Sequence, residues 1–259
     1  MSKQAIGIFD SGVGGTSIWK EINKLLPNEN TIYLADSKNA PYGSKGKEVI
    51  IDLSIKNTEY LLNQNCKLIV VACNTATTNA IDYLRETYQV PFIGIEPAIK
   101  PAALKTKTNT IGILATKGTL SSTLFYKTSS LFTSNIKVIE QVGEGIVELI
   151  EGGQLYSDEL RGLLKVYLKP MLEAQIDYLV LGCTHYPYLI PLLIKLLPKH
   201  VKIIDSGEAV ARQTKAILQK ESLYNTEATK PNLQFFTNGK PVVMQSLLEN
   251  KFDVQYLDF

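Results

Sequence analysis

The sequence predicts an α/β protein of two similar domains, each a mainly parallel sheet flanked by helices, with the active site in the cleft between them. Short β-branched runs such as residues 68–72 alternate with longer amphipathic stretches such as residues 16–26, which is typical of parallel sheets covered by helices. The chain has 259 residues, more than one domain usually contains. Sequence similarity between its two halves also favours two domains.

The expected elements alternate along the whole chain. Strands are predicted at residues 5–9, 31–35, 68–72, 92–95, 110–114, 136–140, 178–181 and 202–204. Helices are predicted at residues 16–26, 49–63, 77–87, 158–172 and 208–220. Near the C-terminus, residues 232–236 and 252–256 are expected to form two last strands around a helix at 241–249.

The two halves of the chain resemble each other in three places. IGIFDS at 6–11 resembles IGILAT at 111–116, an offset of 111 − 6 = 105 residues. LIVVACNT at 68–75 resembles YLVLGCTH at 178–185, an offset of 183 − 73 = 110, and FIGI at 92–95 resembles KIID at 202–205 at the same offset. Matches in the same order at nearly one offset indicate two related α/β halves that face each other.

A Pro-containing and Lys/Thr/Asn-rich connection at residues 96–107 predicts the boundary between the halves. The tail after Ser206 is longer than the second half needs, so we expect it to cross back and complete the first sheet. The predicted domains are therefore residues 1–97 plus 207–259 and residues 98–206.

Composition excludes several classes of protein. A net charge of +2 is too small to indicate binding to nucleic acid or an anionic membrane, and the longest apolar runs are too short to span a bilayer. Asp10 interrupts the only early apolar run, so no signal peptide is expected. Three cysteines without CxxC spacing argue against disulfides and a zinc ribbon, which favours the reducing cytoplasm. The expected partner is a small-molecule substrate.

A pair of cysteines is the strongest chemical signal in the sequence. Cys73 and Cys183 each follow a predicted strand and precede a predicted helix, where ligands bind in open α/β sheets. The positive end of a helix favours a thiolate. One thiol on each wall of a cleft is suited to inverting a stereocentre, because one group removes a proton while the other delivers one. Polar neighbours make burial alone a poorer explanation: Asn74, Thr75, Thr184 and His185.

The glycine loop FDSGVGGT at residues 9–16 lies between a predicted strand and helix. A dinucleotide fingerprint with Asp36 as the ribose ligand is one alternative, but Ser17 stands where glycine or alanine is needed, and Asp10 repels pyrophosphate. We favour backbone N–H groups and the Ser11 hydroxyl holding a small carboxylate- or ammonium-bearing substrate. Asp10 then accepts a hydrogen bond from a substrate ammonium or orients the Cys73 thiol, and simple N-capping is the alternative role.

Two further polar segments follow strands. The loop DSKNAPYG at residues 36–43 is a candidate for contacting the substrate. His185 is expected to tune the thiol of Cys183 or to place positive charge beside a substrate carboxylate. A metal site formed by Cys73, Cys183 and His185 is disfavoured, because the paired spacing and a fourth ligand are missing.

With these motifs the chain resembles the glutamate racemases, bacterial enzymes that interconvert L- and D-glutamate without a cofactor for peptidoglycan synthesis. The motifs are FDSGVGG at 9–15, Asp36 with PYG at 41–43, ACNTA at 72–76, Glu96-Pro97 and GCTHYP at 182–187. They occur in the family's order across essentially the whole chain. The sequence departs from the family at Lys38-Asn39, Thr77 and residues 143–145, which bears on oligomer and regulatory contacts.

The resemblance implies a role for each matching residue. Cys73 and Cys183 are the acid/base pair, assisted by Asp10 and His185, and a homodimer is possible. The implied substrate-binding residues are Asp10, Ser11, Pro41, Tyr42, Gly43, Asn74, Thr75, Thr116, Thr119, Thr184 and His185. Asp36 and Glu151 are implied as supporting residues behind them. No cofactor or metal is expected.

The predicted reaction is proton transfer at the α-carbon of glutamate, with domain closure around the substrate. An aspartate or hydantoin racemase is one alternative, which retains both cysteines but has different binding loops. A dinucleotide-dependent oxidoreductase and a non-catalytic ligand-binding module are the others, and the missing signal peptide argues against the last.

Overall fold

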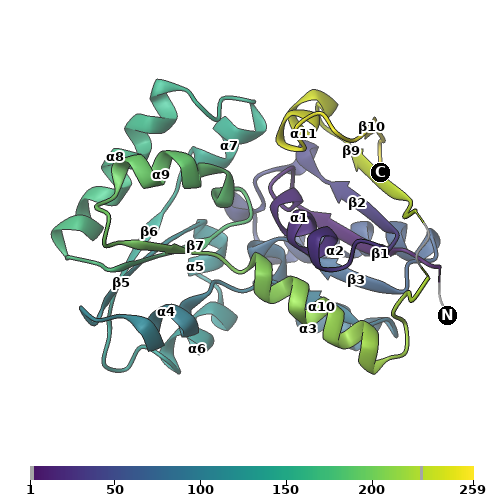
Figure 1. Cartoon of the computed structure of the whole chain (residues 1–259), viewed down its shortest axis with the longest axis horizontal. Coiled ribbons are helices and arrows are strands. Elements are labelled where there is room, and N and C mark those ends of the chain that lie inside the picture. The colour runs from purple at the N-terminus through teal and green to yellow at the C-terminus, as the bar shows by residue number, and fades with distance from the viewer. Residues whose placement is uncertain (1–2, 228–229) are drawn as a thin grey trace.

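A computed structural model describes residues 3–227 and 230–259 of the chain and contains two parallel β-sheets side by side (Figure 1). Every strand pair in both sheets is parallel. In spatial order the first sheet consists of β10 (Gln255–Tyr256), β9 (Leu233–Thr237), β2 (Thr31–Ala35), β1 (Ile6–Asp10), β3 (Leu68–Val71) and β4 (Phe92–Gly94). The second consists of β6 (Lys137–Val142), β5 (Thr110–Ala115), β7 (Tyr178–Gly182) and β8 (Lys202–Ile204).

Helices surround both sheets, as the alternating pattern predicts. Those of the first sheet are α1 (Thr16–Leu25), α2 (Lys47–Asn63), α3 (Asn74–Thr87), α10 (Gly207–Lys220) and α11 (Pro241–Leu247). Those of the second are α4 (Ile99–Lys105), α5 (Lys117–Leu120), α6 (Thr123–Ser130), α7 (Ile146–Glu151), α8 (Asp158–Glu173) and α9 (Ile190–Leu196). Short 3₁₀ helices in the described part of the chain are η1 (Ser37–Asn39), η2 (Tyr42–Ser44) and η3 (Tyr186–Leu189). The predicted fold class is confirmed.

The two sheets share one internal order. The run β2-β1-β3-β4 in the first corresponds to β6-β5-β7-β8 in the second. Gly7 in β1 is in register with Ile69 in β3, and Gly112 in β5 is in register with Leu179 in β7. The repeated sequences therefore occupy equivalent central strands, so the residues after β3 and after β7 lie at equivalent sheet ends.

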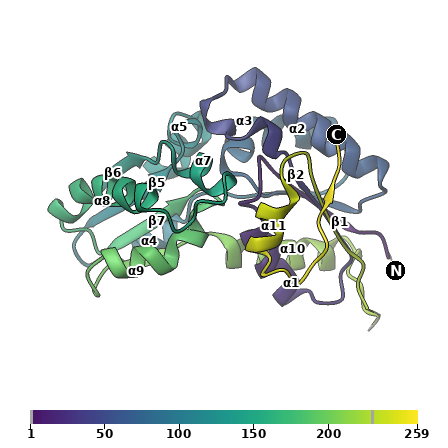
Figure 2. The ribbon, with the colours of Figure 1, turned by 90° about the horizontal axis from the view of Figure 1, so that it is seen from above.

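After the second sheet the chain returns to the first. β9 pairs with β2, and β10 pairs with β9, so the C-terminal segment extends the first sheet at its outer edge (Figure 2). Trp19 of α1 fixes this segment: its ring lies 4.7 Å from that of Phe235 and 5.0 Å from that of Phe252, both edge-on. We propose residues 1–97 with 207–259 as the first domain and residues 98–206 as the second.

A buried ion pair also ties the returning chain to the first sheet. Lys67 Nζ lies 2.6 Å from Glu29 Oε2, and both side chains are almost inaccessible to solvent. Lys67 also donates to the carbonyl of Leu223, and Glu29 accepts a hydrogen bond from the backbone N–H of Asn225. Buried charges require such partners, and here two of them belong to the connection that leads to β9.

Element boundaries differ from the predicted ones where polar residues in a helix interrupt the apolar pattern that predicts it. The helix predicted at 77–87 begins at Asn74, because Cys73 caps it and the polar Asn74 and Thr75 form its first turn. The predicted connection at 96–107 contains the short helix α4. Across the described residues, the helices all fall short of the length and apolar character needed to cross a membrane.

Candidate active site

Both predicted cysteines line one small cavity between the two domains. The space available to the centres of water molecules is about 10 Å³, roughly that of a single water. Its wall is formed by Ser11, Pro41, Tyr42, Gly43, Cys73, Asn74, Thr75, Thr116, Val147, Cys183, Thr184 and His185. The cavity is therefore built from both domains, carries several polar side chains in its wall and is small in this structure.

Cys73 lies at the end of β3 and caps helix α3. Its Sγ accepts a hydrogen bond from the Ala76 N–H at 3.4 Å and donates to Ser11 Oγ at 3.5 Å. Burial and the nearby Asp10 carboxylate raise the pKa of Cys73, and the hydrogen bonds offset only part of this. The helix end favours the thiolate, as the sequence predicts, but at Cys73 desolvation outweighs the dipole.

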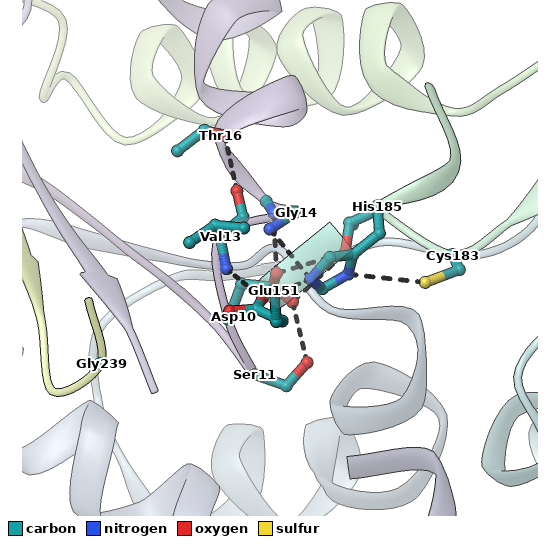
Figure 3. A network of polar contacts seen from close by, with 12 residues as sticks. Asp10, Ser11, Val13, Gly14, Thr16, Glu151, Cys183, His185 and Gly239 are labelled. Atoms are coloured by element: carbon teal, nitrogen blue, oxygen red, sulfur yellow. Dashed lines mark hydrogen bonds and ion pairs between the residues drawn. The ribbon is translucent and has the colours of Figure 1, made fainter. Parts of the chain in front are cut away.

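Cys183 has a different environment from the one that the sequence predicted. The 3₁₀ helix η3 follows it, and α9 begins only at Ile190, so no α-helix begins at the thiol. Its partner is His185, whose Nδ1 lies 3.7 Å from Cys183 Sγ (Figure 3). The opposite ring nitrogen, Nε2, lies 2.6 Å from Glu151 Oε1. The two thiols thus have unlike surroundings, although their strands are equivalent.

The hydrogen bonds of His185 to Cys183 and Glu151 favour the positively charged form of its ring. Burial would lower the pKa of His185, but hydrogen bonds to Cys183 and Glu151, and the charges of these groups, raise it well above its ordinary value. In the charged form Nε2–H donates to Glu151 and Nδ1–H donates to Cys183 Sγ. The Gly14 N–H also points at Nε2, and that contact suits the neutral ring. An imidazolium in this position stabilises negative charge on sulfur.

Asp10 is fully buried behind the cavity wall, between the two domains. Its carboxylate accepts hydrogen bonds from the N–H of Gly15 at 2.7 Å and from Thr184 Oγ1 at 3.3 Å. Burial raises the pKa of Asp10 to about 6, although the positive charge of His185 and the Gly15 hydrogen bond lower it. The sequence-based proposal that Asp10 supports Cys73 fits its place behind Ser11, and this role remains a proposal.

Replacing Asp10 by asparagine is expected to stabilise the protein at pH 7. The folded state holds the Asp10 proton more tightly than the unfolded state does, so its contribution to stability falls as pH rises from about 4 through about 6. The difference between 3.8 and about 6 corresponds to at most about 3 kcal/mol. Asparagine retains an acceptor for the Gly15 N–H and removes that cost.

Urea unfolding of wild type and D10N at pH 7 and pH 4 measures this effect. We expect D10N to gain about 1–3 kcal/mol at pH 7 and much less at pH 4. Equal stabilities at both values of pH, or a less stable variant at pH 7, would contradict the assignment of a buried, costly carboxylate.

The sequence predicts that backbone N–H groups of the glycine loop hold a substrate, but three of them, those of Val13, Gly14 and Gly15, are directed at side chains of the protein itself. The Val13 N–H donates to Glu151 Oε1 at 2.7 Å (Figure 3). The Gly15 N–H donates to Asp10 Oδ2 at 2.7 Å. The Gly14 nitrogen lies 3.2 Å from His185 Nε2. A Cβ on Gly14 would lie 2.3 Å from His185 Nδ1, so glycine is required for this approach. The loop binds the second domain's own carboxylate in place of a ligand.

Threonine hydroxyls from both domains meet at another part of the wall. Thr75 Oγ1 lies 2.8 Å from Thr116 Oγ1 and 3.3 Å from Thr119 Oγ1, and the last two are 3.1 Å apart. Asn74 lines the cavity, and neither its Oδ1 nor its Nδ2 has a hydrogen-bond partner among the described residues. A buried amide without partners is available to a polar ligand.

Most of the sequence-predicted residues meet at this cavity. Four lie behind the lining residues and contact them: Asp10, Asp36, Thr119 and Glu151. Sequence reasoning missed Val147, which lines the cavity from α7. In the sequence Val147 is an apolar residue on an amphipathic helix, and such a residue cannot be distinguished from one that packs in the hydrophobic core.

The geometry also bears on the alternatives. Asp36 is fully buried and accepts hydrogen bonds from Asn39, Tyr42 and Asn238, so it is not available to a ribose hydroxyl. Across residues 3–227 and 230–259, no three His, Cys, Asp or Glu side chains form a cluster that could hold a metal ion.

Two thiols from two related α/β domains in one small cavity are suited to removing and returning a proton at a stereocentre, which is the chemistry of racemases and epimerases. Comparison with known proteins gives the family. The model of the Asp/Glu/Hydantoin racemase family matches residues 6–214. The glutamate racemase of Ectopseudomonas mendocina is 46% identical over 95% of this chain and 94% of its own. The chain belongs to the Asp/Glu/Hydantoin racemase family and is an amino-acid racemase.

Solved structures agree in fold over the whole chain. The glutamate racemase of Escherichia coli, in complex with L-glutamate and the activator UDP-MurNAc-ala, has a TM-score of 0.86 and 32% identity, covering 98% of this chain and 97% of its own. That of Francisella tularensis, in complex with D-glutamate, has a TM-score of 0.84 and 29% identity, covering 100% and 98%.

Proposed function

We propose that the protein interconverts L- and D-glutamate by proton transfer at the α-carbon between Cys73 and Cys183, without a cofactor. The observation that carries the proposal is that both thiols line one small cavity, one from each domain. The curated relatives that it resembles at 44–47% identity are named glutamate racemases, which favours glutamate as the substrate. Metal, nucleic acid and membrane play no part in this proposal.

One direction of the reaction starts from a thiolate at Cys183 and a thiol at Cys73. The Cys183 thiolate, paired with the His185 imidazolium, takes the α-hydrogen as a proton, so that an S–H bond forms and the electron pair of the C–H bond remains on the substrate. The Cys73 thiol then delivers its proton to the opposite face of the carbon. Cys73 ends as the thiolate and Cys183 as the thiol, which is the state needed for the other enantiomer.

The remaining wall stabilises the charge that develops on the substrate carboxylate. Asn74 contributes an amide without other partners and Thr75 contributes a hydroxyl, whereas the Thr184 hydroxyl, which also lies in the wall, donates to Asp10. The cavity has room for about one water, so the domains must open to admit an amino acid and close around it. Closure keeps water away from the α-carbon of the substrate, whose hydrogen is a very weak acid.

The cellular role that we propose is to supply D-glutamate for peptidoglycan synthesis in the cytoplasm. Family membership supports it. A homodimer remains a proposal from the resemblance alone, and its test is the mass of the protein in solution by light scattering.

Circular dichroism with a panel of enantiopure amino acids tests the substrate. We expect L- and D-glutamate each to lose optical activity at a rate far above that of aspartate, with no added nicotinamide cofactor. Faster turnover of aspartate would overturn the choice of substrate. Tight binding of glutamate without any loss of optical activity would instead indicate a binding module.

A further inference from the structure

The loop that carries Pro41, Tyr42 and Gly43 is held from behind by a buried polar network. Tyr42 lines the cavity, and its hydroxyl donates to Asp36 Oδ2 at 2.5 Å. The same hydroxyl accepts a hydrogen bond from Asn57 Nδ2 of α2 at 3.1 Å. The side chain of Tyr42 is therefore fixed at its polar end by residues outside the cavity.

The C-terminal segment supplies a second support. Asn238 follows β9, and its Nδ2 donates to Asp36 Oδ1 at 2.5 Å while its Oδ1 accepts from the Lys38 N–H at 2.9 Å. The next residue, Gly239, lies so close to the loop that a Cβ there would be 2.5 Å from Ser37 Cβ. One asparagine thus binds both the Asp36 carboxylate and the backbone of the loop.

The opposite side of the loop has little space for movement. A Cβ on Gly43 would lie 2.8 Å from Thr116 Cβ in the second domain. The loop is consequently confined between the second domain on one side and Asp36, Asn57 and Asn238 on the other. A shift on the network side changes where the loop meets a bound substrate.

The contacts of Asn57 indicate that its amide serves the loop more than the fold. Asn57 is fully buried, yet its Oδ1 has no hydrogen-bond partner among the described residues. An unpaired buried acceptor is destabilising, and an apolar side chain of similar size would avoid it. The favourable contact that remains is the hydrogen bond to the hydroxyl of Tyr42.

We propose that Asn57 and Asn238 are positioning residues for substrate binding: through Tyr42 and Asp36 they hold the segment Pro41–Tyr42–Gly43 against the amino acid in the closed cavity. This inference rests on the proposed function. Neither residue lines the cavity, so the effect passes through the loop.

The test compares steady-state racemisation of both enantiomers by wild type, N57L and N238D. N57L removes the Nδ2 donor to the Tyr42 hydroxyl together with the unpaired Oδ1. N238D replaces the Nδ2 donor to Asp36 by a carboxylate oxygen, which places a second negative charge beside Asp36. We expect KM to rise about tenfold for both enantiomers, which corresponds to about one hydrogen bond. The kcat values should stay within about twofold, and their pH profiles should not shift, because neither thiol is touched.

Enantiomers have an equilibrium constant of one, so kcat/KM is equal in both directions for every variant. A disturbed thiol would lower kcat, because each direction uses both thiols, whereas a displaced binding loop raises both KM values together and leaves kcat nearly unchanged. This difference separates positioning of the substrate from damage to the catalytic groups.

The matched control is N225L. Asn225 is also a buried, hydrogen-bonded asparagine, but it contacts Glu29 and Asn28 ahead of β2, away from the cavity. We expect N225L to lower the melting temperature and to leave both KM values unchanged. Y42F provides a second route if N57L folds poorly, because it deletes only the hydroxyl that Asn57 and Asp36 share.

Y42F should raise KM at least as much as N57L does, because it removes the hydrogen bonds to both Asn57 and Asp36. The double variant Y42F/N57L should be no worse than Y42F alone, since the bond to Asn57 is already absent there. Unchanged KM values in folded N57L and N238D, or a rise in N225L of the same size, would overturn the inference. An inactive wild type would instead refute the proposed function itself, so the two failures are distinguishable.

Discussion

Replacing Cys73 or Cys183 by serine is expected to lower kcat for racemisation at least about a thousandfold in both directions. Each reaction uses one sulfur to remove the proton and the other to return one, and acid–base groups typically contribute factors of about 10² to 10⁴. A serine hydroxyl is a much weaker acid than a thiol, so it replaces neither function. Polarimetry of L- and D-glutamate with each purified variant measures the loss.

Hydrogen exchange in deuterated water gives a sharper signature of the same pair. C73S should still exchange the α-hydrogen of the enantiomer whose hydrogen faces Cys183, and C183S should exchange that of the opposite enantiomer. Proton NMR of each enantiomer with each variant measures these rates. If one variant retained full activity in both directions, the assignment of two bases would be wrong.

Replacing Gly14 by alanine is the second substitution with a large expected effect. The new Cβ would lie 2.3 Å from His185 Nδ1 and 2.6 Å from the His185 backbone nitrogen, so a rotamer change alone cannot relieve the clash. The glycine loop and the second domain must separate, which displaces the imidazolium beside Cys183. A displacement of about 1 Å in a catalytic site can reduce the rate about a hundredfold, and we expect a loss of kcat/KM of at least that size.

Gly162→Ala is the matched control for this substitution. Gly162 lies within α8, and no atom approaches the position of its Cβ within 4 Å. Alanine there should raise stability by about 0.5–1 kcal/mol and leave kcat/KM unchanged. A G14A variant with wild-type kcat/KM would show that the close approach of the loop to His185 is not needed for catalysis.

The sequence predicts the strands well because a buried parallel strand requires a β-branched run, which stands out from the polar segments around it. Thr31–Ala35 and Lys202–Ile204 have the predicted boundaries. The cavity is also largely predictable. Parallel strands bring their carboxyl ends to one edge, so the polar residues after β1, β3 and β7 meet there.

The environments of those residues depend on contacts between distant parts of the chain and could not be predicted. Helix geometry favoured a thiolate at both cysteines, whereas burial dominates at Cys73, and His185 is the partner of Cys183. The glycine loop looked like an anion site, and only the fold shows that Glu151, 138 residues from Val13, occupies its N–H group. The contact of Asn238 with Asp36 likewise depends on the returning C-terminal segment.

Racemisation of L-glutamate in deuterated water tests most directly whether Cys73 and Cys183 exchange protons with the α-carbon in one cavity. Circular dichroism would follow inversion while proton NMR follows the α-hydrogen of the same sample, with no cofactor or metal added. The account predicts loss of the optical signal together with one solvent deuterium entering the α-carbon for each inversion. Inversion with the original hydrogen retained in every product molecule, or no inversion at all, would contradict it.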